Sequence, residues 1–433
     1  MNSLPFVSIL AALGLGAATV MHADWRADAD ARIERLRKSD FEVQARDPSG
    51  ATLAVKGLTY RLVRHRFLFG TAIAYRPFAD QGPDGRHYRD FILANFSGLV
   101  CENEMKWYDD EAEAGHENYA EADALLQFAE QHGLVMRGHN LFWAKEKYAM
   151  NWLKPLDATQ LRAAVERRLD DTVTRYRGRV ICWDVNNEML DGTFFRDRLG
   201  ADIVPWMYKE TARLDPNARL FVNEYGILGN PEKTGRLIGL VHDLQAHGAP
   251  VGGIGIQSHD SDRLTEDPTA KVLPGDRPEW MLKNPLTPEM FLGTLDRIYR
   301  ETKLPIHLTE ISAKVPSAED RADKLEMLFR LGFSHEAVQA ILLWGFEART
   351  HWMGPQAALM EADGSLNAAG KRISHLLQEE WTSKGEARMA ADGEGHFRGF
   401  RGLYELRLEL ADGRTVTRQV ALDGAAPTVV VVP

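Results

Sequence analysis

The sequence has few cysteines, no excess of positive charge and no apolar run long enough for a convincing membrane span. Its 433 residues include 2 cysteines, Cys101 and Cys182, and each lies inside an apolar strand-like segment. We therefore expect two buried free thiols rather than a disulfide framework. The formal net charge of −10 argues against a nucleic-acid or anionic-membrane partner, because both require a basic face. A neutral or mildly charged substrate fits this composition better.

The apolar run from Leu4 to Val20 is too short and too rich in Gly and Ala for a membrane span. It has the composition of a secretory signal that ends near Ala23, although no Lys or Arg precedes it. We therefore expect export to the periplasm or the extracellular space. An ordinary apolar N-terminal tail is the alternative.

Short apolar segments alternate with segments of helical periodicity along most of the chain. The strand-like segments are 67–74, 97–103, 135–143, 180–188, 219–226, 252–259, 306–312 and 337–347. Helical spacing is clearest at 119–132, 157–176, 231–247, 288–302 and 319–331. This order predicts an α/β fold, a (β/α)8 TIM barrel. A doubly wound open sheet is the competing fold, but no Gly-rich phosphate loop follows the first strand.

Shifts in composition divide the chain into four parts. We expect a signal peptide at 1–23, a helix and β-extension at 24–66, the catalytic barrel at 67–382 and a β-appendage at 383–433. A polar linker is expected at 382–395. The appendage contains no Trp, so we expect an edge sheet packed on the barrel rather than a sugar-binding module.

Two of the predicted strands run directly into carboxylates. The segment from Ile181 to Glu188 ends in two amides and a Glu, and the segment from Pro305 to Ser312 contains Glu310. Because a barrel gathers its functional residues at the carboxyl ends of its strands, these two Glu are expected at one site. Two carboxylates at one site favour glycoside hydrolysis, which needs neither metal nor cofactor.

The other predicted strand ends carry further carboxylates, amides and aromatic residues, a mixture that suits a sugar. The candidate substrate-binding residues are Glu102, Asn103, Lys106, His139, Trp143, Asn187, Tyr225, Gln257, His259, Trp344 and Trp352.

Seven motifs occur in an order that resembles glycoside hydrolase family 10. They are Phe67–Gly70, Glu102–Trp107, Arg137–Trp143, Trp183–Glu188, Gly255–His259, Leu308–Glu310 and Leu342–Trp344. The resemblance covers the chain from about Phe67 to Trp381. The stretches Trp143–Trp152 and Gly332–His335 resemble plant members of the family.

The resemblance implies a retaining endo-1,4-β-xylanase that acts on xylan or xylo-oligosaccharides, with Glu188 as acid/base and Glu310 as nucleophile. Their carboxyl groups are then expected about 5 to 5.5 Å apart. It further implies that Asn187 bonds the sugar 2-hydroxyl, that Gln257 lines the same subsite, and that His259 holds the nucleophile in place. The neighbouring glycone subsite is implied for Glu102, Asn103 and Lys106, and stacking walls for Trp344 and Trp352.

Two positions depart from the family pattern. Ala144 stands where the family usually has a His that contacts the glycone, and Ser312 stands where an Asp often pairs with the His of the sixth strand. The first departure puts subsite contacts in question, and the second weakens the expected support of His259.

Three alternatives remain open. A metal-dependent barrel hydrolase would use histidines such as His139, His259 and His307, but no His-x-His follows the first strand and a two-metal site would require more Asp. A catalytically weak sugar-binding barrel is motivated by Ala144, although binding alone does not require both carboxylates. Another β-linked glycan, such as a mixed-linkage glucan or a decorated xylan, is the third.

Overall fold

The computed structural model describes residues 24–272, 281–390, 393–424 and 426–432. The expected signal peptide, 1–23, lies outside the described residues. No helix within the described ranges is long and apolar enough to cross a membrane.

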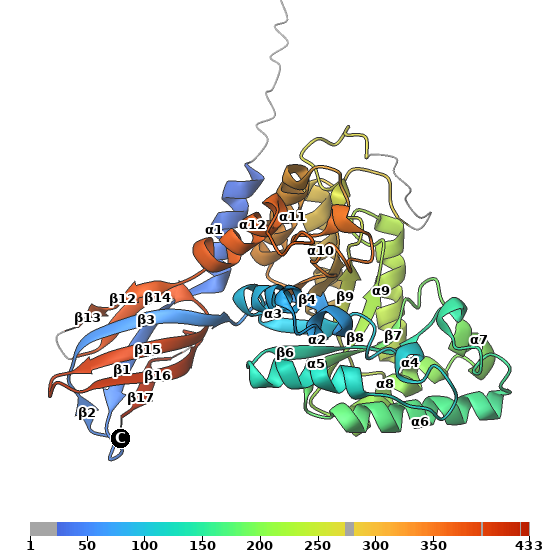
Figure 1. The fold of residues 1–433 in the computed structure, drawn as a ribbon, viewed down its shortest axis with the longest axis horizontal. Coiled ribbons are helices and arrows are strands. Elements are labelled where there is room, and N and C mark those ends of the chain that lie inside the picture. The colour runs from blue at the N-terminus through green and yellow to red at the C-terminus, as the bar shows by residue number, and fades with distance from the viewer. Residues whose placement is uncertain (1–23, 273–280, 391–392, 425, 433) are drawn as a thin grey trace, which may run out of the picture.

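Eight parallel strands close into a barrel, which confirms the predicted (β/α)8 fold (Figure 1). Their order around the barrel follows the chain, and the last strand pairs with the first at Ala340 and Leu68. The strands are β4 (Leu68–Ile73), β5 (Gly98–Cys101), β6 (Val135–Trp143), β7 (Val180–Asn187), β8 (Arg219–Glu224), β9 (Val251–Gln257), β10 (Ile306–Ile311) and β11 (Val338–Leu343). Cys101 and Cys182 are buried free thiols, as expected.

Helices between these strands form the outer layer of the barrel. Several begin at a side-chain cap that the sequence supplies: Asp157 and Gln160 form a capping box, and Asn230, Thr287 and Ser317 each accept a backbone N–H of the first turn. The helices are α2 (Tyr75–Ala79), α3 (Pro83–Asn95), α4 (Trp107–Asp110), α5 (Ala120–Gln131), α6 (Ala158–Tyr176), α7 (Phe194–Leu199), α8 (Ile203–Leu214), α9 (Pro231–Ala246), α10 (Pro288–Thr302), α11 (Ala318–Ser334) and α12 (Ala368–His375).

A β-sandwich stands beside the barrel and is built from both ends of the described chain (Figure 1). One sheet has the order β13-β14-β1-β17, with β2 on β1, and the other has the order β12-β3-β15-β16. Aromatic rings fill the space between the sheets: Phe397 stacks on Tyr60 at 3.7 Å, and Phe41 lies 5.6 Å from Tyr404. The strands are β1 (Lys38–Arg46), β2 (Thr52–Leu53), β3 (Val55–His65), β12 (Lys384–Glu386), β13 (Arg388–Met389), β14 (Gly395–Phe400), β15 (Gly402–Leu410), β16 (Thr415–Leu422) and β17 (Thr428–Val431).

The sandwich corrects two expectations. The segment 382–395 is not a plain linker, because β12 pairs with β3 and β13 pairs with β14. The C-terminal strands do not form an edge sheet on the barrel either, because β14 pairs with β1 and β15 with β3. Periodicity identified these strands, but it carries no information about which distant strand each one pairs with.

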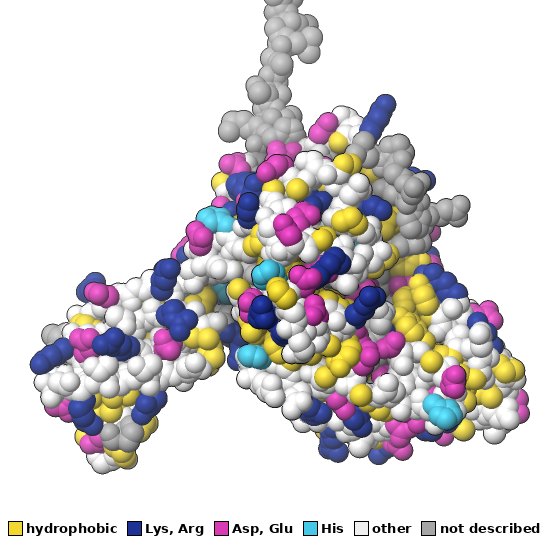
Figure 2. Space-filling model, in the orientation of Figure 1, with side chains coloured by type: hydrophobic (Ala, Val, Ile, Leu, Met, Phe, Trp, Pro, Cys, Tyr) yellow, Lys and Arg dark blue, Asp and Glu magenta, His cyan; other side chains and the backbone are white. Residues whose placement is uncertain are grey.

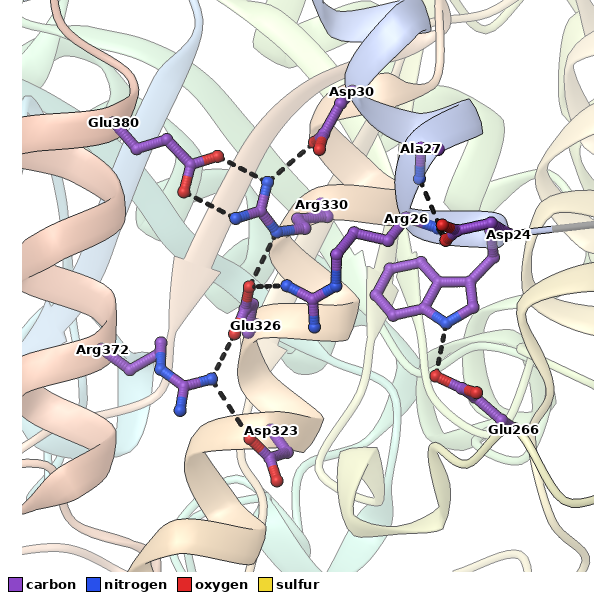
Figure 3. A network of polar contacts seen from close by, with 11 residues as sticks. Asp24, Arg26, Ala27, Asp30, Glu266, Asp323, Glu326, Arg330, Arg372 and Glu380 are labelled. Carbon is purple, nitrogen blue, oxygen red and sulfur yellow. Dashed lines mark hydrogen bonds and ion pairs between the residues drawn. The ribbon is translucent and has the colours of Figure 1, made fainter.

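Helix α1 (Trp25–Arg37) is held against the barrel by a network of ion pairs (Figure 3). Arg26 of α1 pairs with Glu326 of α11, which also accepts from Arg330 at 2.8 Å and pairs with Arg372 of α12. Arg330 in turn reaches Asp30 of α1 at 2.7 Å. This network ties the segment before the sandwich to the last helices of the barrel.

Candidate active site

A cleft of about 230 Å³ lies at the carboxyl ends of the barrel strands. It brings together residues from seven of the barrel strands or the loops that follow them. The lining residues are Glu102, Asn103, Lys106, Tyr108, Trp143, Lys145, Lys147, Tyr148, Glu188, Tyr225, Gln257, His259, Glu310, Trp344 and Trp352. All predicted site residues are in this set except His139 and Asn187, which are buried at 1% exposure.

Glu310 is in β10 and is held by hydrogen-bond donors. Asn223 Nδ2 donates to its Oε1 at 2.7 Å, and His259 Nε2 lies 3.0 Å from its Oε2. Burial alone would raise the pKa of Glu310, but the hydrogen bond with His259 and the electrostatic effects of His139, His259 and Lys106 outweigh burial and lower this pKa. The arrangement favours an ionised Glu310.

Glu188 directly follows β7 and faces a different set of groups. Gln257 Nε2 lies 3.3 Å from its Oε1, and Lys145 Nζ lies 2.7 Å from its Oε2. Its backbone N–H donates to the carbonyl of Asn223 at 3.1 Å. The Glu188 carboxylate therefore has an ammonium partner, which was not predicted from the sequence.

Both glutamates have a left-handed backbone, with φ of 60° at Glu188 and 56° at Glu310. This conformation is uncommon for a residue other than glycine and costs about 1–3 kcal/mol each. Strain of this kind concentrates at functional sites, where the surrounding structure compensates for it.

His139 and Asn187 form a buried layer beneath the cleft. His139 Nδ1 lies 2.8 Å from Asp184, whose carboxylate also pairs with Arg137, and the His139 ring lies 5.1 Å from the ring of Trp344. Asn187 Oδ1 accepts from Asn223 at 2.9 Å. These contacts fix the cleft floor, and a direct contact of Asn187 with a sugar stays a prediction.

The other end of the cleft is aromatic and carries Lys106. Its Nζ lies 4.9 Å from the Trp143 ring centre and 5.5 Å from that of Trp344. Burial lowers the pKa of Lys106 and raises that of nearby Glu102 to about 7. Trp352 is 42% exposed, so its ring is accessible at the cleft edge.

Four lining residues were not predicted from the sequence: Tyr108, Lys145, Lys147 and Tyr148. Three of them lie just after β6, where Tyr148 stacks on Trp143 at 3.5 Å. Lys145 and Lys147 could have been predicted to line the cleft, because they are charged residues that directly follow Trp143 at the end of β6.

The two departures from the family pattern have different outcomes. Ala144 lines a smaller neighbouring pocket with Gly192, and its backbone bonds Asn187 and Phe194 at 2.9 Å, so Lys145 is the residue that enters the main cleft. Ser312 Oγ lies 3.4 Å from Trp352 Nε1, so it contacts an aromatic wall of the cleft.

Comparisons with known proteins agree with this geometry. The family model for glycosyl hydrolase family 10 matches residues 59–373. An anti-sigma-I factor, RsgI6 of Acetivibrio thermocellus, is 36% identical over 88% of this chain and 46% of its own length. Endo-1,4-beta-xylanase 2 of Arabidopsis thaliana is 35% identical over 93% of this chain and 35% of its own length. The chain thus spans less than half of either relative.

The solved structures show the same barrel. Native xylanase 10B from Thermotoga maritima superposes with a TM-score of 0.61 at 22% identity, covering 73% of this chain and 96% of that one. Xylanase 10B from Thermotoga petrophila in complex with xylobiose gives the same score and identity over 73% of this chain and 95% of that one. At this identity the likeness establishes the fold. With the family model matched over most of the barrel, the chain belongs to glycosyl hydrolase family 10.

Proposed function

We propose that the chain hydrolyses β-1,4-xylosidic bonds within xylan by double displacement. The observation that carries the proposal is the contrast between the two carboxylates: donors from Asn223 and His259 favour an ionised Glu310, whereas Glu188 has one amide and one ammonium as partners. Family membership supplies the reaction class.

In the first step, the Glu310 carboxylate attacks the anomeric carbon while Glu188 gives its proton to the departing glycosidic oxygen. The products are a glycosyl ester on Glu310 and a shortened chain with a new hydroxyl. In the second step, Glu188 takes a proton from water, the water oxygen attacks the same carbon, and the ester bond to Glu310 breaks. One water is consumed, and the anomeric configuration is retained.

Lys145 must move away from Glu188 during this cycle. Its Nζ lies 2.7 Å from Glu188 Oε2, and the departing glycosidic oxygen has to come within hydrogen-bond reach of that carboxyl group in the first step. We propose that the sugar on the leaving-group side takes the place of Lys145 Nζ, which stays near Tyr225, whose hydroxyl lies 3.0 Å from that nitrogen.

The test is reducing-end release from unbranched xylan by the wild type, Glu310→Gln and Glu188→Gln. We expect an active wild type and losses of several orders of magnitude in both variants. An aryl xylobioside with a good leaving group separates the roles, because the phenolate departs without a proton from an acid as the glycosyl ester on Glu310 forms. It should restore the first step in Glu188→Gln and not in Glu310→Gln.

Two outcomes would replace this proposal. A wild type that is inert on xylan but cleaves a mixed-linkage glucan would move the substrate to another β-linked glycan. A folded wild type that binds xylo-oligosaccharides and cleaves no β-glycan would indicate a sugar-binding barrel.

Export of the chain is a separate proposal, which rests on the apolar run from Leu4 to Val20. Fractionation of cells that express the full chain tests it, and a product confined to the cytosol would overturn it.

A further inference from the structure

A second cleft, of about 850 Å³, lies at the opposite end of the barrel from the two glutamates. Its barrel side is formed where the strands begin, at Leu68, Val135, Ile181 and Arg219. The segment that joins the sandwich to the barrel supplies its other side. The molecular surface is indented where the sandwich meets the barrel (Figure 2).

Positive charge predominates in this cleft although the whole chain has a net charge of −10. Glu336 is its one acidic lining residue, against a set of five arginines: Arg37, Arg64, Arg66, Arg219 and Arg401. None of these five forms an ion pair with a carboxylate of the described chain. Like charges gathered without counter-charges repel one another, so the cleft attracts anions.

The arginines differ in how far their guanidinium groups are already used. Arg37 donates to the carbonyl of Phe333 at 2.7 Å, and Arg401 donates to Ser39 Oγ at 2.7 Å. Burial, together with the charge of Arg401, lowers the pKa of Arg37 to about 10. By contrast, the side chains of Arg64 and Arg66 make no hydrogen bond to the described residues. The guanidinium groups of Arg64 and Arg66 are therefore the ones available to a ligand.

An independent feature of the same cleft is His307, which is 2% exposed and lines its floor. Its Nδ1 has no hydrogen-bond partner among the described residues. A buried polar atom without a partner is costly and calls for a ligand or water. Burial lowers the pKa of His307 well below its usual value, so the ring is neutral.

Apolar side chains complete the lining. Leu36, Leu68, Val135 and Ile181 are all half-buried, so their aliphatic surface is partly accessible. A bare phosphate or sulfate would use the arginines alone, whereas a uronic acid offers a carboxylate to the arginines and C–H faces to the aliphatic groups. The cleft volume accommodates more than a single small anion.

We propose that this cleft is a second, non-catalytic binding site for an acidic glycan, held through uronate carboxylates by Arg64 and Arg66. The choice of a glycan rests on the proposed function, because an enzyme of polysaccharides meets uronate-bearing chains with its substrate. Bound there, such a chain keeps the catalytic cleft at the other end of the barrel close to the same polymer.

The test is calorimetric titration of the full chain carrying Glu310→Gln with tetragalacturonate, and with xylotetraose as the neutral probe. We expect Arg64→Ala/Arg66→Ala to weaken tetragalacturonate binding by about tenfold or more, since each lost charged bond costs affinity. Xylotetraose binding should stay unchanged. Arg86→Ala/Arg418→Ala removes two arginines outside the cleft and should bind both probes as the parent does.

Four results would overturn the inference. These are no binding of tetragalacturonate, equal binding by the Arg64/Arg66 variant, equal weakening in the control variant, and full displacement by equimolar inorganic phosphate, which would make it a simple anion site. Xylan hydrolysis by the wild-type chain is measured in parallel. If that activity is present while tetragalacturonate fails to bind, the second site is wrong and the proposed function stands.

Discussion

Lys145 Nζ lies 2.7 Å from Oε2 of Glu188, the residue we assign as acid/base, and 3.0 Å from the hydroxyl of Tyr225. Tyr225 donates onward to Asp191 at 2.6 Å, and Lys233 reaches the same carboxylate at 2.6 Å. The candidate proton donor is therefore linked to a chain of charged groups outside the cleft.

Replacing Lys145 by Met should raise kcat/KM on xylo-oligosaccharides. The Lys145 ammonium lies 2.7 Å from the Glu188 carboxylate, in the place that we propose for the sugar on the leaving-group side. Without the ammonium this sugar has no ion pair to displace, so kcat/KM should rise by roughly threefold to tenfold, the equivalent of about 1 kcal/mol for a partly exposed ion pair. Steady-state kinetics on xylotetraose compare the variant with the wild type.

Lys147→Met is the matched control, because Lys147 also lines the cleft and its Nζ lies over the Tyr148 ring at 4.5 Å. It removes the same charge and should leave kcat/KM close to the wild-type value, because its Nζ lies over the Tyr148 ring and not beside Glu188. Equal changes in both variants would show that the general charge of the cleft, and not the pair with Glu188, affects turnover.

Replacing His259 by Ala should shift the acidic limb of the pH profile of kcat/KM. The contact at 3.0 Å is the first of the effects that outweigh burial and lower the pKa of Glu310. Without it this pKa rises, so Glu310, the proposed nucleophile, stays protonated to higher pH and the acidic limb moves upward. An unmoved acidic limb with a reduced kcat would assign His259 to sugar contact alone.

Glu224→Gln should stabilise the fold at alkaline pH. Burial raises the pKa of Glu224 from 4.5 to about 8, so the folded state binds the extra proton and loses stability as pH rises from 4.5 to 8. The amide keeps an acceptor for the Leu190 N–H, now 3.0 Å from the carboxylate, without that penalty. Thermal unfolding should favour the variant by on the order of a few kcal/mol at pH 9, and by much less at pH 5. A Glu224→Gln variant that is equally destabilised at both pH values would contradict this prediction.

Glu326→Ala should destabilise the chain. Glu326 has a side chain that is 4% exposed and pairs with Arg26, Arg330 and Arg372 (Figure 3). Its loss leaves the buried Arg330 with Glu380 and Asp30 as its remaining partners, so we expect a cost of about 1.5–3 kcal/mol, the range for a hydrogen bond between charged groups. Asp323→Asn removes an exposed partner of Arg372 and should change denaturant midpoints little.

The same network predicts a pH window. Hydrogen bonds from Arg330 and Arg372 outweigh burial and lower the pKa of Glu326. Stability from this group is present above its unfolded value and is lost as pH falls through the lower folded value. Glu326→Ala should therefore approach wild-type stability in acid.

The barrel strands were predictable because each is a short buried run, and both candidate catalytic glutamates were found because they terminate such runs. Lys145 and Tyr148 were not, since they lie in a loop whose path over Glu188 depends on contacts such as the Tyr148 stack on Trp143. The same limit applies to Ala144, where a shift of one residue decides which side chain enters the cleft.

The pairing of the sandwich strands could not be predicted from the sequence for another reason. Phe41 of β1 opposes Phe397 of β14, and alternation identifies both strands without naming their partners. The barrel lies between β1 and β14 in the sequence, and its folding brings the two strands together.

This interleaving also imposes an order on synthesis. Strands β1 and β3 leave the ribosome early, yet their partners β14 and β15 follow only after the last barrel helix. Apart from the short pairing of β2 with β1, the two early strands have no partner until the entire barrel has been synthesised, and their open edges can associate with other chains. The sandwich can therefore form only after the full barrel has been synthesised.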